Sequence, residues 1–313
     1  MATESGGGSA GIGEPRRISA RAFDGPIAIE IRNLPAAEAE AAMRRAVIEI
    51  LEVEALAEGS TVSDEPLDLR LRRLLNRSLR FCRWSEGATG PLGGQLAKLW
   101  GLRGTAAGRP TPDRLEEAVR SARCDALTID EESSTARLAE GSLLDLADFA
   151  PGFAVDRAVE VLRQKGVTNG LVRVGPVTRG VGPGPGGRGW PVELPQLEGL
   201  EESLGTAWLK DQALALASIR GNALRVGGDS LAPYLDQRSG RPATGRVATL
   251  TVTELGLDAQ ALSTALFVLG SREGEFRVSA LKPTPAVLWL LGSGTGAPLL
   301  SSYRWSQVKV TNP

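Results

Sequence analysis

The clearest pattern in the chain lies between residues 145 and 175, where an apolar stripe with helical spacing leads into a β-rich run. Val155, Ala158, Val159 and Leu162 recur at the i, i+3, i+4, i+7 spacing of one buried helix face. The opposite face carries polar residues: Asp156, Arg157, Glu160, Arg163 and Gln164. The pattern therefore predicts an amphipathic helix with one face in a core.

Both ends of this helix carry recognisable signals. Pro151 suits a first helical turn, where its missing N–H leaves no hydrogen bond unmade, and Gly166 suits the left-handed residue that ends a helix. Residues 171–174 then read as a strand. A helix start in such a loop–helix–strand unit is a natural place for phosphate, although most units of this kind form only core.

The remaining pattern predicts a mixture of strands and helices. Residues 26–32 alternate apolar and polar positions, and residues 36–58 carry a helical stripe formed by Met43, Val47, Ile50 and Leu51. Further helices are expected at 64–77, with leucines inward, and from residue 112. Further strands are expected at 126–129, 135–138, 206–218 (as a pair), 247–252, 286–291 and 299–303.

A glycine cluster at residues 180–189 is a weak candidate for a phosphate-binding loop. It lacks the Gly-Lys-Ser/Thr ending of a P-loop, and no helix follows it. We interpret it as a hairpin-like loop. The glycines at 292, 294 and 296 lie between two apolar runs and indicate a second hairpin loop.

Composition narrows the class of protein. The 313 residues carry a formal net charge of -1, with 42% hydrophobic and 23% charged residues, which is typical of a soluble globular protein. This balance gives no reason to expect nucleic acid or anionic lipid as a partner. No run of eighteen apolar residues occurs, so no membrane span is expected.

The first residues are rich in glycine and serine, and no apolar core of a signal peptide follows them. We expect residues 1–22 to form a flexible tail, residues 23–313 to form the folded domain, and the protein to be cytoplasmic.

In a reducing compartment Cys82 and Cys124 would be idle thiols, the alternative being a single disulfide bridge between them. Histidine is absent, so any chemistry must use carboxylates, hydroxyls, amines or backbone groups.

Three blocks of the sequence resemble one family. Residues 145–156 are similar to D-L-G-G-I-A-K-G-Y-A-V-D, residues 234–243 to the end of H-I-I-D-P-R-T-G-R-P, and residues 259–270 to A-D-A-L-S-T-A-L-F-V-L-G. Residues 85–101 resemble a further segment that ends in L-W-G. These blocks are those of the FAD:protein FMN transferases, the ApbE-like family also called thiamine-biosynthesis lipoproteins.

The resemblance implies an α+β fold with mixed or antiparallel sheets and a cleft between two lobes, at roughly 23–140 and 141–313. It also implies a magnesium-dependent transfer of FMN from FAD to a serine or threonine of an acceptor protein. The flavin substrate would contact Ala150, Gly152, Gly175, Asp236, Arg238 and Gly240. The cation would be held by Thr264, by the residue at 260 and by the backbone carbonyl of Ala150.

This chain departs from the family at the polar positions. Gln260 stands in place of the cation-binding aspartate, Pro233 in place of a histidine, and Pro151 in place of a lysine. A neutral amide is a poor replacement for a carboxylate on a strongly hydrated cation. Asp236 with Arg238 can also be explained as a turn with an internal ion pair, and Thr264 as a helix residue bonded to a carbonyl.

The sequence leaves three hypotheses open. The first is an active transferase in which Asp148, Asp236 or Asp258 supplies the lost charge. The second is a non-catalytic scaffold or partner-binding subunit, and the third is a flavin binder without transfer. The replacements favour lost or much reduced transferase activity.

Overall fold

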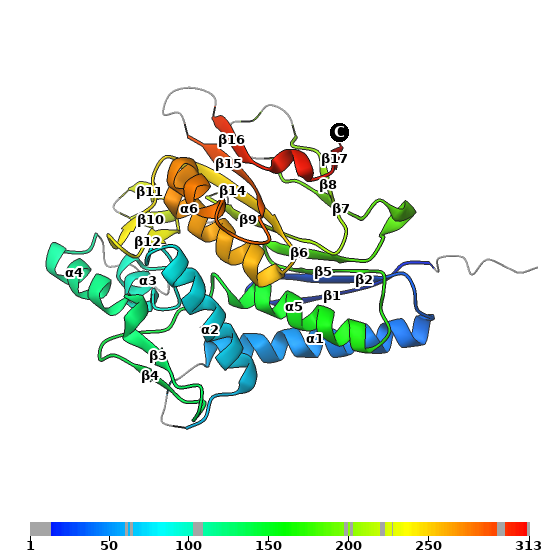
Figure 1. The fold of residues 1–313 in the computed structure, drawn as a ribbon, viewed down its shortest axis with the longest axis horizontal. Helices are drawn as coiled ribbons and strands as arrows, with labels where there is room; N and C mark the ends of the chain where they lie inside the picture. Colours follow the sequence, from blue (N-terminus) through cyan, green and yellow to red (C-terminus); the bar gives the residue numbers. More distant parts are fainter. Residues whose placement is uncertain are drawn as a thin grey trace, which may run out of the picture.

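The computed structural model describes residues 14–59, 62, 65–102, 109–196, 200, 203–219, 223–226, 228–292 and 298–311. Its centre is an eight-stranded sheet in which every neighbouring pair is antiparallel (Figure 1). In sheet order the strands are β1 (Arg16–Ala22), β2 (Gly25–Ile31), β5 (Gly170–Val174), β6 (Val177–Val181), β9 (Ala213–Ser218), β14 (Arg246–Thr253), β15 (Ala286–Leu291) and β16 (Leu299–Tyr303).

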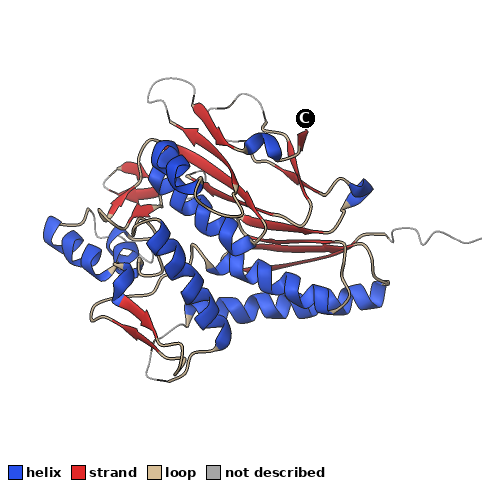
Figure 2. Ribbon diagram, viewed as in Figure 1, coloured by secondary structure: helices blue, strands red, loops and turns tan. Residues whose placement is uncertain are grey.

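Three helices cover one face of this sheet, as the secondary-structure colours of Figure 2 make clear: α1 (Ala36–Glu58), α5 (Ala150–Gln164) and α6 (Gly256–Val278). The apolar stripe predicted for α5 is buried, with Val155, Val159 and Leu162 in the main core. The alternating residues Ile27, Ile29 and Ile31 of β2 enter the same core. Apolar residues that repeat every second position in β2, and about every 3.6 positions in α5, thus place one face of each element in the core.

A smaller sheet, in the order β17-β8-β7, covers the other face. Its strands are β7 (Trp190–Glu193), β8 (Thr206–Leu209) and β17 (Val310–Thr311), and its apolar residues share a core with Ala248, Leu250 and Val252 of β14. The alternate β14 residues Thr249 and Thr251 are buried on the other face, where Thr251 Oγ1 donates to the carbonyl of Ala259 at 2.5 Å. The fold is therefore layered α+β with antiparallel sheets, as predicted.

The remaining elements lie beside these layers (Figure 1). The helices are α2 (Leu69–Trp84), α3 (Gly94–Trp100) and α4 (Pro112–Ser121). Two-stranded sheets form from β3 (Leu127–Ile129) with β4 (Ala136–Leu138), β10 (Leu224–Val226) with β11 (Asp229–Leu231), and β12 (Leu235–Asp236) with β13 (Arg241–Pro242). Short 3-10 turns lie at Cys124–Ala126 (η1), Pro185–Gly187 (η2) and Trp305–Gln307 (η3).

Several expectations need correction. Residues 16–22 are not tail but form β1, because they pair along their whole length with β2. The strands expected as a pair at 206–218 exist, yet they belong to different sheets: β8 pairs with β7, whereas β9 pairs with β6 and β14. The large sheet takes strands from both sides of residue 140, so the expected lobe boundary does not separate two sheets. The expected hairpin of 286–291 with 299–303 is confirmed, although its loop residues 293–297 lie outside the described residues.

The expectation of two free thiols is wrong. Cys82 of α2 and Cys124 of η1 form a disulfide with a Cα–Cα distance of 5.9 Å. It joins α2 to the segment that leads into β3. Among the described residues, no helix combines the length and the apolar character needed to cross a bilayer.

Candidate functional site

A cavity of about 550 Å³ opens where α5 begins, between the end of α1, the start of α3 and the turn that follows β5. Ala150 and Gln260, both predicted from the sequence, line it, and Pro176 lies beside the predicted Gly175. Gly175 occupies the turn between β5 and β6 with φ +52°, and its N–H donates to the carbonyl of Pro26 at 3.1 Å. The fold therefore brings three widely separated predicted segments to one cavity.

The ionisable side chains of this cavity are mostly acidic. Asp24, Glu58 and Asp145 line it together with one lysine, Lys98 of α3. Sequence reasoning missed Asp24, Glu58 and Lys98, although Lys98 lies within the recognised block that ends in L-W-G. This excess of carboxylates repels an anionic pyrophosphate unless a bound cation compensates for it.

Gln260 is buried and uses both ends of its amide. Its Oε1 accepts the backbone N–H of Gly152 at 2.6 Å, and its Nε2 donates to the carbonyl of Ala147 at 3.0 Å. The side chain thus fastens α6 to the first turn of α5 and to the segment before it. The bond from Gly152 uses one lone pair of Oε1, and the amide is neutral, so Gln260 brings no negative charge to a hard cation.

Gly152 lies inside the first turn of α5, which begins at Ala150. A Cβ at this position would lie 2.5 Å from the carbonyl oxygen of Gly256 and 2.8 Å from Cα of Leu257. The glycine therefore permits the close crossing of α5 and α6, which positions Gln260 on Gly152.

Thr264 lies one turn after Gln260 on α6 and faces Asp148. The Thr264 Oγ1 to Asp148 Oδ1 distance is 3.5 Å, which is at the limit of a hydrogen bond. Of the three aspartates considered as a replacement charge, Asp148 is the one beside the predicted cation ligands. Asp236 pairs with Arg238, and Asp258 pairs with Arg77.

The described residues contain no group of three or more histidines, cysteines, aspartates or glutamates arranged to hold a metal. Gln260, Thr264 and Ala150 bring oxygen atoms but no negative charge, and the amide oxygen of Gln260 is already bonded. The predicted set therefore does not fit magnesium in the way that the resemblance implies.

Asp236, Arg238 and Gly240 form a separate turn, and none of them lines this cavity. Arg238 makes two parallel bonds to Asp236, Nε to Oδ1 at 3.0 Å and Nη2 to Oδ2 at 2.8 Å, and a third bond to Glu273 at 3.0 Å. The hydrogen bonds to Asp236 raise the pKa of Arg238 most strongly, and Glu273 adds to this effect. This geometry is the turn with an internal ion pair that the sequence left open as an alternative explanation of these residues.

Gly240 closes the same turn with φ +68°, and its N–H donates to the carbonyl of Asp236 at 2.7 Å. The indole N–H of Trp100 donates to the carbonyl of Gly240 at 2.7 Å, so α3 holds the turn in place.

Tyr234 follows Pro233, the position of the family histidine. Burial raises the pKa of the Tyr234 phenol, and the negative charge of Asp148 raises it further. The phenol oxygen accepts the backbone N–H of Ser218 at 3.1 Å, and the ring packs on Phe267 with centroids 4.6 Å apart. A neutral phenol held in this way is a poor proton acceptor near neutral pH.

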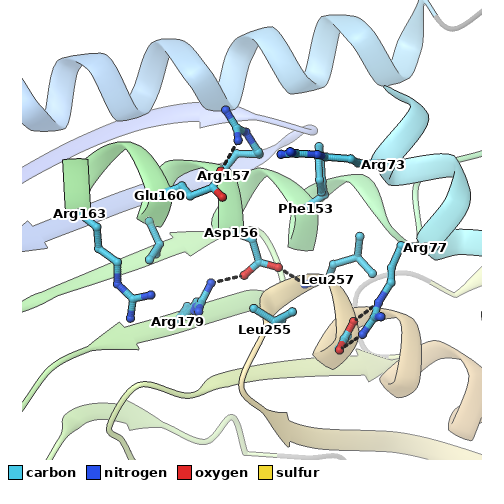
Figure 3. Close-up of a pocket in the computed structure, with 12 residues that line it drawn as sticks. Arg73, Arg77, Phe153, Asp156, Arg157, Glu160, Arg163, Arg179, Leu255 and Leu257 are labelled. Atoms are coloured by element: carbon cyan, nitrogen blue, oxygen red, sulfur yellow. Dashed lines mark hydrogen bonds and ion pairs between the residues drawn. The ribbon is translucent and has the colours of Figure 1, made fainter. Parts of the chain in front are cut away.

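The last residue of the first block, Asp156, caps α6 (Figure 3). Its carboxylate accepts the N–H of Gly256 at 2.7 Å, the N–H of Leu257 at 3.0 Å, and Nη1 of Arg179 at 2.6 Å. Burial raises the pKa of Asp156, against the opposing effects of Arg179 and the two backbone donors. The helical pattern placed Asp156 on the polar face of α5, but it could not show that this face meets the start of α6.

Comparison with known proteins agrees with this architecture. The model of the ApbE family matches residues 18–288. The FAD:protein FMN transferase of Haemophilus influenzae is 27% identical over 247 residues, which cover 76% of this chain and 71% of that protein. The chain therefore belongs to the ApbE family, the FAD:protein FMN transferase family.

Solved structures show the same fold. The ApbE protein of Thermotoga maritima superposes with a TM-score of 0.79 at 21% identity, covering 94% of this chain and 98% of that one. The flavin transferase ApbE of Vibrio cholerae gives a TM-score of 0.77 at 20% identity, covering 93% and 96%. At these identities the likeness establishes the fold alone.

Proposed function

We propose that this chain is a transferase homologue in which magnesium-dependent transfer of FMN from FAD to a protein is lost or strongly reduced. The observation that carries this proposal is the double engagement of Gln260, whose amide bonds to Gly152 and Ala147. A neutral amide that bonds to two backbone groups therefore stands where the family has a carboxylate on the cation.

Two further observations support reduced transfer. The cavity holds three carboxylates and one ammonium group, so an unaccompanied pyrophosphate of FAD would be repelled. The position of the expected proton acceptor is Pro233, and the adjacent Tyr234 is kept neutral by burial. Deprotonation of an acceptor hydroxyl therefore has no evident base among these residues.

A second candidate is an active transferase with a relocated carboxylate. Asp148 favours it, because its Oδ1 lies 3.5 Å from Thr264 Oγ1, close to the predicted cation position. In that case Asp148 and Thr264 would hold the cation, which would neutralise charge on the pyrophosphate. The acceptor in either case would be a serine or threonine of a protein that the sequence does not identify.

The deciding experiment is intact-mass spectrometry of an acceptor protein that carries the family's serine or threonine motif, incubated with FAD, Mg²⁺ and this protein. The flavin transferase of Vibrio cholerae serves as the active comparison. We expect no mass increase equal to FMN with this protein. An FMN adduct that disappears with Asp148→Asn would reject the first proposal and support the relocated carboxylate.

A further inference from the structure

Two cavities that are distinct from the Gln260 cavity adjoin along α2. One, of about 370 Å³, lies between α2, α5 and the start of α6, and the other, of about 350 Å³, lies between α2, the start of α6 and residues 281–283. They share Arg77, Leu255 and Asp258 and therefore adjoin, and the two cavities together are here named the basic groove. None of its lining residues lines the Gln260 cavity.

Arginines of α2 follow the length of this groove. Arg73, Arg77 and Arg80 stand at i, i+4 and i+7 and therefore lie on one face of the helix. At 1.5 Å per residue, the first and last are separated by roughly 10 Å along the helix axis. Figure 3 shows Arg73 reaching from α2 toward α5 beside Phe153.

The cations of the groove differ in their partners. Arg77 pairs with Asp258, Arg157 with Glu49 and Glu160, and Arg179 with Asp156. Arg73, Arg80 and Lys282, in contrast, make no ion pair with any of the described residues. These three charges are spread along both cavities, and Arg73 and Arg80 are exposed.

The charge of the groove is opposite in sign to that of the chain. Seven basic and four acidic side chains line the two cavities, whereas the whole chain has a formal net charge of -1. A local excess of positive charge on such a protein favours an acidic ligand.

The surface between the charges is apolar. Phe153 and Leu257 are buried in the first cavity, and Phe81 and Leu262 are buried in the second. Leu255 stands between them and is 39% exposed, which makes it one of the few large apolar side chains on the surface. The groove therefore offers an apolar centre with basic groups on both sides.

We propose that the basic groove binds an acidic peptide segment of a partner protein, with a large apolar side chain placed over Leu255 and carboxylates at Arg73 and Arg80. An extended segment with acidic residues about three positions apart, or one helical face with acidic residues at i and i+7, spans the required ~10 Å. The proposal does not depend on whether FMN transfer is active.

A peptide fits this groove better than a nucleic acid or a lipid surface does. Glu160, Glu254, Asp156 and Asp258 also line it, and a continuous row of phosphates would face them, whereas the proposed peptide has carboxylates only at Arg73 and Arg80. Its apolar centre suits a leucine-like side chain, whereas a phosphate backbone gains nothing there.

The test is fluorescence anisotropy with a short fluorescein-labelled peptide in which glutamates flank a central pair of leucines. A matched peptide carries glutamine in place of each glutamate. We expect saturable binding of the acidic peptide that weakens at high salt, and at least about tenfold weaker binding to Arg73→Glu/Arg80→Glu.

The control variant is Arg137→Glu/Arg272→Glu, which makes the same change in charge at exposed positions outside the groove. It should bind the acidic peptide within about twofold of the unaltered protein. Circular dichroism of both double variants separates loss of binding from loss of folding.

Several results would overturn the proposal. The proposal fails if the acidic peptide does not bind, or if the glutamine peptide binds as tightly as the acidic one. It also fails if Arg137→Glu/Arg272→Glu weakens binding as much as Arg73→Glu/Arg80→Glu does. Tighter groove-dependent binding of inorganic polyphosphate or of anionic phosphatidylserine vesicles would assign the groove to phosphate groups instead. Light scattering that shows a dimer broken by Arg73→Glu/Arg80→Glu would assign it to a second copy of the chain.

Discussion

Gly152 of α5 and Gly256 of α6 meet backbone to backbone where the two helices cross. A Cβ at Gly152 would lie 2.5 Å from the carbonyl oxygen of Gly256, and a Cβ at Gly256 would lie 2.8 Å from that of Gly152. A side chain at either glycine would therefore collide with the backbone of the other helix. The close contact allows Gln260 of α6 to reach the N–H of Gly152.

We expect Gly152→Ala to reduce the free energy of unfolding by about 1–3 kcal/mol, because backbone atoms must move apart to make room. The better helix propensity of alanine opposes this loss only in part. Urea denaturation followed by circular dichroism measures the change. Gly292→Ala is the matched control, since its nearest neighbours would lie 3.9 Å away, and it should change stability by less than about 0.5 kcal/mol.

The sequence predicted the helices and strands that are marked by a local pattern of apolar and polar residues. The stripe of Val155, Val159 and Leu162 placed the core face of α5 correctly, and the long helix at 36–58 was found within its observed bounds. Apolar periodicity is a local property, so it can be read without knowing what packs against the element.

The features that the sequence could not reveal depend on distant partners. The bond between Gly152 and Gln260 joins residues 108 positions apart, and the cap of Asp156 on Gly256 joins residues 100 positions apart. The resemblance identified position 260 as important, but only the fold shows that each end of its amide bonds to a backbone group. Likewise, nothing local reveals that β8 and β9 enter different sheets.

The disulfide between Cys82 and Cys124 leads to a prediction about stability. Reduction, or Cys82→Ser, should reduce the free energy of unfolding by up to about 4 kcal/mol, since the bond closes a loop between residues 42 positions apart. Urea denaturation with and without dithiothreitol measures this loss. Such bonds persist mainly in oxidising compartments, whereas thiols in the cytosol are usually kept reduced.

Alkylation of the unreduced, denatured protein followed by mass spectrometry checks the bond itself. No alkyl group should be added before reduction, and both cysteines should react after it. Alkylation of both cysteines without reductant would show that the bond is absent in the protein tested.

Because Asp156 caps α6 and pairs with the buried Arg179, replacing its carboxylate with an amide should destabilise the protein strongly. Asp156→Asn should reduce the free energy of unfolding by about 3–5 kcal/mol, because Arg179 is left as a buried charge without its partner. Glu116→Gln is the control, since its ion pair with Arg120 is exposed on both sides and should contribute less than about 0.5 kcal/mol. Similar losses in the two variants would contradict the assigned role of the buried pair.

Variants of Gln260 can test whether this residue prevents Mg²⁺ binding, with stability as the only measurement. Gln260→Asp and Gln260→Asn have nearly equal size, and both are too short to keep the bonds to Gly152 and Ala147. Each should therefore destabilise the fold by about 1–3 kcal/mol, because buried polar groups lose their partners. The two variants differ in that the aspartate adds a negative charge next to Thr264 and Asp148.

Mg²⁺ should raise the melting temperature of Gln260→Asp and leave those of Gln260→Asn and the unaltered protein unchanged, because only the aspartate variant gains an anionic ligand. At a hundredfold excess over its dissociation constant, the cation would add about 2.7 kcal/mol to the free energy of unfolding. Differential scanning calorimetry with and without Mg²⁺ measures the shift. If the unaltered protein gains as much as the aspartate variant, Gln260 does not exclude the cation, and the relocated carboxylate of Asp148 becomes the better explanation.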